Sequence, residues 1–236
     1  MTTTATIHAD ESMYAPMAAV VDLRASGYLW LSALFNGPPS AELIHLPGEP
    51  AFAAVVGEVA GDGLAAELAA ASGADLDELR WEYNALFRVP GGVYLTPYES
   101  VYRGRRVVEG KECLGLLNGP ETVAVLRDYR SLGVELEPGQ QTLPDFAGAE
   151  IEFLRLLTRR EQEAWGRDDA VAAADLLARQ RCFLLDHVCT WLPELCARLG
   201  ERTTQPFYAA ASRFARAFLA LEEVTFRVLP VVADEG

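Results

Sequence analysis

The sequence predicts an all-α fold, a single-domain helical bundle. Apolar residues recur at helical spacing through most of the chain, no segment combines strand-like alternation with hairpin turns, and glycines and prolines stand where the helical patterns stop. The chain has 236 residues, of which 50% are hydrophobic, so it can bury a sizeable core. We interpret it as one helical domain over residues 14–232 that follows a flexible N-terminus, residues 1–13.

The predicted helices share apolar positions at helical spacing and span residues 14–36, 49–71, 75–87, 120–132, 145–165, 168–199 and 206–229. Asp75 suits an N-cap, because its carboxylate can accept hydrogen bonds from free amides of the first turn. Pro120 fits a first helical position, and Gly133 fits the left-handed residue that ends a helix. Pro193 should kink its helix or end it just before, because proline removes a backbone donor.

Three segments between these helices carry other signals. The stretch "VPGGVYLTPYES" is predicted to be a loop, because its two prolines cannot sit in a helix interior. Residues 107–117 are ambiguous, and a short helix around "KECLGLL" fits them. The polar stretch "ELEPGQQTLPD" indicates a hinge at residues 134–144, between an N-terminal helical part, residues 14–133, and a C-terminal part, residues 145–232.

Two sets of residues recur every seven positions near the C-terminus. The first is a predicted buried stripe made of Phe207, Phe214, Leu221 and Val228, with Phe218 beside it. The second set comprises Cys182, Cys189 and Cys196. Seven residues advance a helix by about 10.5 Å, which is too far for two cysteines to share one zinc ion. We therefore interpret these cysteines as small apolar residues on a buried helix face.

The charge of the chain limits its partners. It carries 34 acidic and 20 basic residues, a formal net charge of −14, which disfavours nucleic acid and anionic membranes and favours a cationic partner. No segment approaches the ~18 uninterrupted apolar residues of a membrane span, so we expect no stable membrane insertion. The first residues lack the basic and apolar regions of a secretory signal, which indicates a cytoplasmic location.

The motif search favours a binding protein over an enzyme. The sequence contains no phosphate-binding G-x-x-x-x-G-K-[ST], no G-x-G-x-x-G, no H-E-x-x-H, no G-x-S-x-G and no C-x-x-C. Glu150 and Glu152 are two positions apart on a predicted helix, so they point in different directions and do not form an acid/base pair. We expect no catalytic residues, no metal site and no cofactor.

Two groups of residues between positions 82 and 104 are the best candidates for binding. Tyr83, Leu86 and Phe87 share one helix face and form either a binding patch or part of the core. The second group follows Pro97, which stiffens the backbone and so reduces the entropy lost when a peptide binds. This group consists of Tyr98, Glu99, Ser100 and Tyr102. Alternatively, its tyrosines pin the loop to the body of the protein.

Three segments carry a resemblance to a known family. They are "EYNALF" followed by a Pro-Gly turn and "PYESVY", then "LPDFAGAEIEFLRLL", then "QRCFLLDHVCTWLPELCARL". In this order they resemble the TorD/DmsD/NarJ-like redox-enzyme maturation chaperones, over about residues 75–200. The resemblance implies a TorD-like helical fold without catalytic machinery. It also implies a cytoplasmic chaperone that binds the leader peptide, often a twin-arginine signal, of a molybdopterin oxidoreductase catalytic subunit until the cofactor is installed.

The resemblance also places the peptide-binding surface. Its positions here are Tyr83, Leu86, Phe87, Pro97, Tyr98, Ser100, Tyr102 and Asp145, to which we add the neighbours Glu99 and Phe146. Phe146 stands where the family usually has histidine, which indicates a divergent subgroup with a different client. His187 and Trp191 match a later family helix, and we expect both to be core residues.

Alternatives to this interpretation stay open. A helical bundle that binds a small apolar or nucleotide ligand would have a deep pocket lined by Trp165, Trp191 and the cysteines, whereas a chaperone would have an open groove beside residues 83–102. A plain interaction or scaffold protein is a third possibility. A monomer and a dimer with domains swapped at the hinge both fit the sequence.

Overall fold

The structure is a computed structural model that describes residues 11–135 and 143–229. The predicted flexible N-terminus and hinge fall largely on residues 1–10 and 136–142, which lie outside the described residues. Residues 11–13 belong to the first helix. The division into parts at a hinge therefore stays a prediction.

Most of the described residues are helical and strands are nearly absent among them, which confirms the predicted all-α class. In chain order the elements are α1 (Glu11–Asn36), α2 (Ala41–His45), α3 (Pro50–Ala60), α4 (Asp62–Ala71), α5 (Leu76–Phe87), α6 (Glu99–Arg103), β1 (Arg106–Val108), β2 (Lys111–Cys113), α7 (Pro120–Ser131), α8 (Ala147–Trp165), α9 (Ala170–Asp186), α10 (Leu192–Arg202) and α11 (Pro206–Val228). Short 3-10 turns cover Leu46–Gly48 and Val188–Thr190. No described helix is long and apolar enough to cross a membrane.

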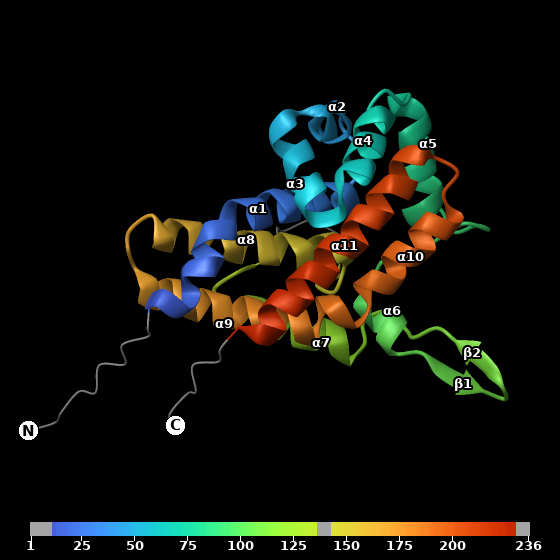
Figure 1. The fold of residues 1–236 in the computed structure, drawn as a ribbon. Helices are drawn as coiled ribbons and strands as arrows, with labels where there is room; N and C mark the ends of the chain where they lie inside the picture. Colours follow the sequence, from blue (N-terminus) through green and yellow to red (C-terminus); the bar gives the residue numbers. More distant parts are fainter. Residues whose placement is uncertain (1–10, 136–142, 230–236) are drawn as a thin grey trace, which may run out of the picture.

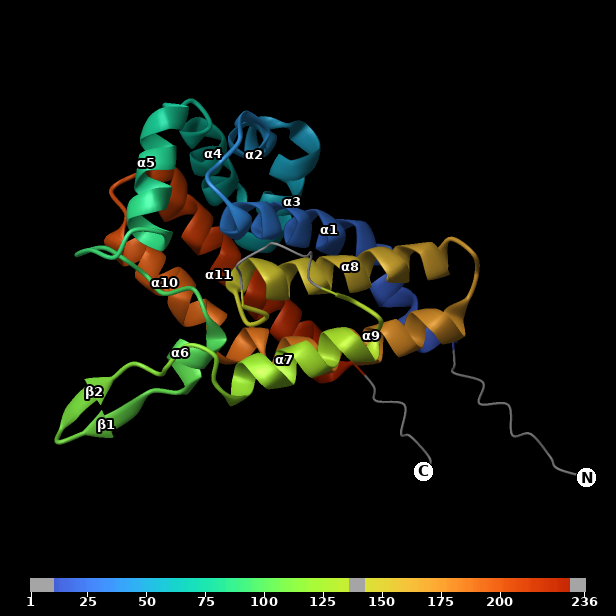
Figure 2. The same cartoon turned by 180° about the vertical axis from the view of Figure 1, so that it is seen from behind.

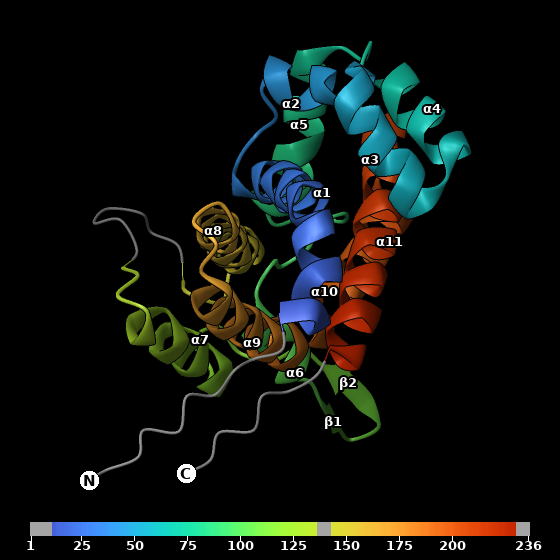
Figure 3. The ribbon, with the colours of Figure 1, turned by 60° about the vertical axis from the view of Figure 1, so that its left-hand side comes forward.

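The long helices pack in two crossed groups. Helix α1 packs on α8, and α8 packs on α9, whereas α11 packs on α10, α3 and α4. Figures 1 and 3 show α11 running across the group formed by α1, α8 and α9. An aromatic cluster joins the groups, with Trp30 of α1 5.5 Å from Phe214 of α11 and 5.6 Å from Phe52 of α3, measured between ring centroids.

One charged cluster lies inside this core. Arg24 of α1 donates hydrogen bonds to Glu161 at 2.7 Å, to Glu222 at 3.1 Å and to Gln180 at 2.6 Å, and Tyr28 donates to Glu222. All five side chains are buried. Burial opposes the charge on Arg24, but Glu222 and Glu161 outweigh it and raise the pKa of the guanidinium. The cluster therefore fixes α1 relative to α8, α9 and α11.

The N-terminal helices differ from the prediction, which did not include α2. The predicted helix over 49–71 is two helices, because Gly61 between α3 and α4 has a φ of 87°, a conformation that ends a helix. Asp75 caps α5 as predicted, since its side chain accepts hydrogen bonds from the amides of Asp77 and Glu78. Pro120 begins α7, and Gly133 after it has a φ of 65°, which confirms both end signals.

The predicted loop and the segment after it contain regular structure. Residues 99–103 form the short helix α6, which begins within the last two residues of the predicted loop and extends beyond it. The expected short helix within 107–117 is wrong, because β1 and β2 form an antiparallel hairpin there. Glu109 and Gly110 connect the strands, both with positive φ, which is the geometry of a two-residue type I′ turn. Figures 1 and 2 show this hairpin projecting from the helical body.

The C-terminal half is divided near Pro193. Helix α9 ends at Asp186, and Pro193 lies in the first turn of α10, so the helix stops before the proline. This break places the cysteines in different environments, because Cys182 is exposed, Cys189 is half-buried and Cys196 is buried. The expectation of one buried cysteine face is therefore wrong for Cys182.

The buried face of α11 also departs from the predicted stripe. Phe207, Phe214 and Phe218 are buried as predicted, whereas Leu221 and Val228 are exposed. A straight α-helix has 3.6 residues per turn, so positions seven apart drift by about 20° per repeat and leave the core. The buried stripe continues through Leu219, Glu222 and Phe226 instead.

Candidate functional site

A cleft of about 700 Å³ lies where α5, α7 and α8 approach the end of α1. The elements that form it can be followed in Figure 2. Its aromatic lining consists of Tyr83, Phe87, Tyr98, Tyr129, Phe146 and Phe153. Its polar lining comprises Asn36, Arg88, Glu135 and Glu152. The cleft is therefore an aromatic surface with carboxylates at its edge.

The end of α5 supplies one wall. The Tyr83 hydroxyl donates to the Phe35 carbonyl at 2.7 Å, which fixes α5 to α1. Burial raises the pKa of Tyr83 to about 12, so this hydroxyl keeps its proton at neutral pH. The Phe87 ring lies 5.2 Å from that of Tyr83, and the Arg88 guanidinium lies 5.7 Å from the Tyr83 ring centroid.

Two segments that are far apart in sequence form the opposite wall, and we call residues 97–100 and 143–147 together the clasp. The Glu99 amide donates to the Asp145 carbonyl, and the Ala147 amide donates to the Pro97 carbonyl, both at 3.0 Å. The Tyr98 and Phe146 rings lie 5.6 Å apart and both line the cleft. The position of this aromatic wall therefore depends on the hydrogen bonds of the clasp.

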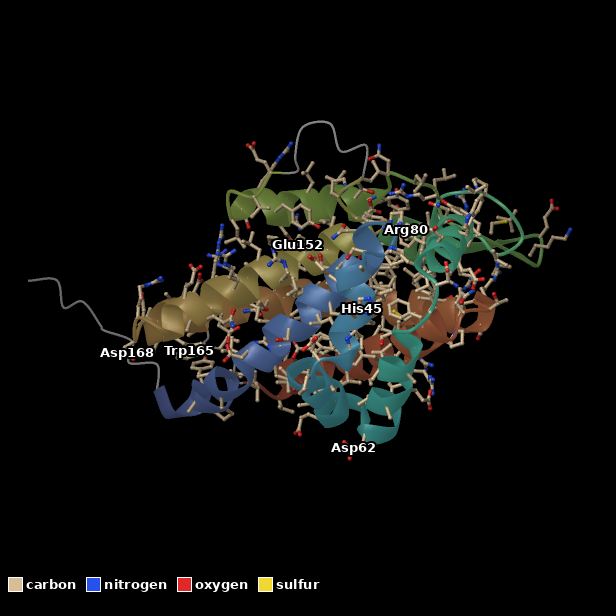
Figure 4. All side chains as sticks on the ribbon, turned by 90° about the horizontal axis from the view of Figure 1, so that it is seen from above. His45, Asp62, Arg80, Glu152, Trp165 and Asp168 are labelled. Atoms are coloured by element: carbon tan, nitrogen blue, oxygen red, sulfur yellow. The ribbon has the colours of Figure 1, made fainter. Side chains whose placement is uncertain are left out.

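Glu152 supplies negative charge at the cleft. Its side chain accepts hydrogen bonds from Ser32 and from Arg155, and it is 44% exposed. Burial alone would raise its pKa, but the hydrogen bonds from Arg155 and Ser32 outweigh burial and lower it. Figure 4 shows Glu152 on α8, between α7 and α1. The group is therefore an ionised carboxylate that faces both the cleft and solvent.

Four of the ten residues predicted for the site meet in the cleft, namely Tyr83, Phe87, Tyr98 and Phe146. The other six do not line it; they are Leu86, Pro97, Glu99, Ser100, Tyr102 and Asp145. Leu86 is a core residue with no exposed surface. Tyr102 packs on Trp191 at 5.3 Å and is covered by Arg105 and Arg198. These two side chains are part of the protein interior.

The remaining buried members of this set surround a polar cluster beneath the clasp. The carboxyl groups of Glu99, Asp145 and Glu150 have no exposed surface, and we call them the acid cluster. Asp145 accepts a hydrogen bond from the Ser100 amide at 3.0 Å, and Glu150 accepts one from the indole of Trp191 at 3.0 Å. The start of α6 and the segment from Asp145 into α8 therefore bring three carboxyl groups together in the interior.

His187 connects the acid cluster to α7. Its Nδ1 lies 2.9 Å from a Glu99 oxygen, and its Nε2 lies 3.2 Å from Asp128. Burial alone would lower the pKa of His187, but the hydrogen bond and charge of Glu99, with those of Asp128, outweigh it and raise the pKa above 6.5. His187 and Trp191 are buried as expected, but both bind carboxylates as well as packing in the core.

Several residues of the site were not predicted from the sequence. Tyr129 and Phe153 line the cleft, but both belong to ordinary apolar helix patterns that carry no signal for a site. Glu150 did carry one, since it stands on the same helix face as Leu154 and Leu157, where a charged residue is unexpected. Glu150 and Glu152 point in different directions, as predicted.

The cleft bears on the alternatives for the ligand. Neither Trp165, Trp191 nor any cysteine lines it, so it is not the pocket expected for a small apolar or nucleotide ligand. Among the described residues, no three His, Cys, Asp or Glu side chains form a group that could hold a metal ion.

Comparison with known proteins gives consistent results. The family described as nitrate reductase delta subunit matches residues 50–197, which is more than half of the chain. A perchlorate reductase assembly chaperone protein of Dechloromonas aromatica is 27% identical over 135 residues, 56% of each chain. A chlorate reductase assembly chaperone protein of Ideonella dechloratans is 33% identical over 131 residues, 54% of this chain and 61% of the relative.

A third relative is the chaperone protein TorD of Vibrio cholerae, which is 27% identical over 123 residues, 52% of this chain and 50% of the relative. The chain thus spans between half and about three fifths of the curated relatives it matches. The family match includes the clasp, the acid cluster and most of the cleft. The chain belongs to the nitrate reductase delta subunit family, the family of the TorD- and NarJ-like proteins.

Proposed function

We propose that this protein is a cytoplasmic, non-catalytic assembly chaperone for the catalytic subunit of a molybdopterin oxidoreductase. It binds the leader peptide of that subunit, its apo form, or both, and the cleft is the peptide site. One observation carries the proposal: Tyr83, Phe87, Tyr98 and Phe146, which come from three separate segments, line a single cleft. The names of the related proteins support the chaperone role.

The chemistry of the cleft suits a leader with arginines and an apolar stretch. Aromatic faces attract guanidinium groups as well as apolar side chains. Ionised carboxylates form charge-assisted hydrogen bonds with arginine, and Glu152 is such a group at the cleft. Glu135, also in the lining, adds a second negative charge. A peptide of opposite charge and similar polarity fits this surface.

The buried residues of the predicted site have an indirect role in this proposal. Glu99, Ser100 and Asp145 hold the clasp, and the clasp holds Tyr98 and Phe146 at the cleft. A substitution of Asp145 should therefore change the fold locally as well as the affinity. Substitutions of Tyr98 or Phe146 should act mainly on affinity.

Isothermal titration calorimetry with leader peptides of molybdenum reductases from the host tests the proposal. Wild-type protein should bind at least one leader, and Tyr98→Ala should weaken that binding about tenfold or more, as expected for loss of an aromatic anchor. Trp81→Ala is the matched control, because Trp81 is an aromatic residue on α5 that is 77% exposed and outside the cleft lining.

The same titration can contradict the proposal. Absence of binding to every host leader would argue against a leader chaperone, and an equal loss for Tyr98→Ala and Trp81→Ala would argue against the cleft. Binding of a nucleotide or a small apolar compound in place of the peptides would favour the alternative function. Circular dichroism of each variant shows whether the helices are intact.

A further inference from the structure

The acid cluster contains more carboxyl groups than nearby cations. Glu99 of α6, Asp145 before α8 and Glu150 of α8 are completely buried, and Asp128 of α7 is close to them through His187. Among the residues that the structure describes, the permanent cation that pairs with a carboxylate of the acid cluster is Arg103 of α6, which donates to Glu99 at 2.5 Å, whereas Asp128 pairs with Arg127. Apart from His187, two neutral donor groups lie against the cluster.

These neutral groups are an indole and a phenol. Trp191 donates to Glu150 at 3.0 Å, and the Tyr129 hydroxyl donates to the Pro144 carbonyl at 3.0 Å. Burial, with Glu150, Asp145 and Glu99 nearby, raises the pKa of Tyr129 well above 10, so it contributes no charge. One arginine therefore cannot balance the buried carboxylates, and isolated buried charges are strongly unfavourable.

Two protons, one on Glu150 and one on His187, balance the charge of the acid cluster. Oε1 of Glu150 has no hydrogen-bond partner among the described residues, and the Glu99 carboxyl is a neighbour within hydrogen-bond reach of the Glu150 carboxyl. With a proton on Oε1, Glu150 can donate to the Glu99 carboxylate. His187 lies between Glu99 and Asp128, and only the imidazolium can donate to both at once.

We propose that protons on Glu150 and His187 lock the clasp, so that the aromatic wall of the cleft is ordered at neutral and acidic pH and is released as the pH rises. The lock acts through Glu99. Its carboxylate accepts hydrogen bonds from protonated Glu150 and His187, and its backbone amide donates to the Asp145 carbonyl. Glu150 and His187 are positioning residues for Tyr98 and Phe146. The consequence for peptide binding rests on the proposed function, whereas the opening of the clasp does not.

The direction of the pH effect follows from both groups. Burial and the neighbouring Glu99 raise the pKa of Glu150 well above its usual range, and the pKa of His187 is also raised. Each group therefore keeps its proton to a higher pH when the clasp is closed than when it is open. Stability of the closed form is complete below the ordinary pKa of each group and is lost as the pH rises towards the raised value.

Hydrogen exchange measures this opening directly. The amides of Glu99 and Ser100, which donate to Asp145, and of Ala147 report on the clasp. Their protection factors, which divide out the chemical effect of pH on exchange, should fall as the pH rises above the ordinary pKa of each group, by up to about tenfold per pH unit for each proton released. In Glu150→Gln, whose amide can donate to Glu99 without titrating, this fall should be about tenfold smaller per pH unit.

Glu163→Gln is the matched control, since Glu163 is an exposed residue of the same helix, paired with Arg159. Its protection factors should follow those of the wild type. Equal pH slopes in wild type and Glu150→Gln would overturn the proposal. If Glu150→Gln does not fold, carboxyl-carbon NMR of wild type decides: one glutamate carboxyl must remain protonated at neutral pH, and its absence overturns the proposal.

Peptide titrations at several pH values separate the two proposals. If alkaline pH weakens leader binding to wild type, and weakens it much less for Glu150→Gln, both the lock and the proposed function are supported. Protection factors with the expected slopes but no leader binding at any pH support the lock and contradict the proposed function. Leader binding with equal slopes supports the function and contradicts the lock.

Discussion

Arg24 lies in the core between two carboxylates, Glu161 and Glu222, and all three side chains are buried. Replacing it with methionine would keep much of its volume but leave both carboxylates without their cation. Breaking a buried ion pair in this way typically costs 3–5 kcal/mol, so we expect Arg24→Met to lower the free energy of unfolding by about that amount. Urea denaturation followed by circular dichroism measures the change.

Arg159 provides the control for this experiment. Its pair with Glu163 on α8 is exposed, with 65% and 52% of the two side chains accessible. Exposed pairs contribute about 0–1 kcal/mol, so Arg159→Met should change little. Equal effects of the two substitutions would show that the buried cluster does not fix α1 in the way its geometry indicates.

At the scale of elements, α1 and α11 approach each other closely at Gly27. A Cβ atom built on Gly27 would lie 2.3 Å from the Phe218 ring, well inside van der Waals contact. Gly27→Ala should therefore destabilise the protein by about 1–3 kcal/mol through overpacking, although alanine favours helix more than glycine does. Thermal unfolding of Gly27→Ala and Gly63→Ala separates these effects, because a Cβ on Gly63 in α4 meets nothing within 4 Å.

Gly63→Ala should be neutral or stabilise by up to about 1 kcal/mol, since only the helix propensity changes there. A neutral result for Gly27→Ala would mean that α1 and α11 can separate at this point without loss. That outcome would contradict the close packing of the two helix groups.

The elements show which parts of the fold a sequence can predict. Helix ends set by local chemistry were predicted correctly, as at Asp75 and Pro120, because a cap acts within a few residues. The break at Gly61 was missed because its neighbours keep a helical pattern and nothing in them requires a positive φ. The hairpin at Glu109 and Gly110 was missed because its strands are only three residues long.

The residues of the site also divide into those brought together by local helix geometry and those brought together by contacts between distant segments. Tyr83 and Phe87 share a helix face, so their proximity follows from helical geometry. The pairing of Tyr98 with Phe146 depends on contacts between segments some fifty residues apart, which periodicity does not encode. The family resemblance placed Tyr98 and Asp145 on one surface, and Phe146 was added as a neighbour, but the resemblance did not distinguish residues that line the cleft from those that support it, such as Asp145.

At the scale of the whole molecule, the net charge affects how a peptide reaches the cleft. The chain carries a formal net charge of −14, and the cleft lining contains two carboxylates, Glu135 and Glu152, against Arg88. Glu152 is also paired with Arg155, so attraction at long range comes from the net charge of the molecule, and the carboxylates of the cleft act at short range. A basic leader peptide would be attracted over a distance and then meet matching groups on contact.

This coupling predicts a strong effect of salt on association. Because salt shortens the Debye length from about 30 Å at 0.01 M to about 3 Å at 1 M, long-range attraction should disappear over that range. We expect the association rate constant of an arginine-containing leader, measured by stopped-flow fluorescence with a labelled peptide, to fall by about tenfold or more. The dissociation rate constant should change less, because aromatic contacts in the cleft are insensitive to screening. A leader with its arginines replaced by glutamine is the control. Its association should be slow and nearly independent of salt. Equal salt dependence of the two peptides would show that the negative field does not guide binding.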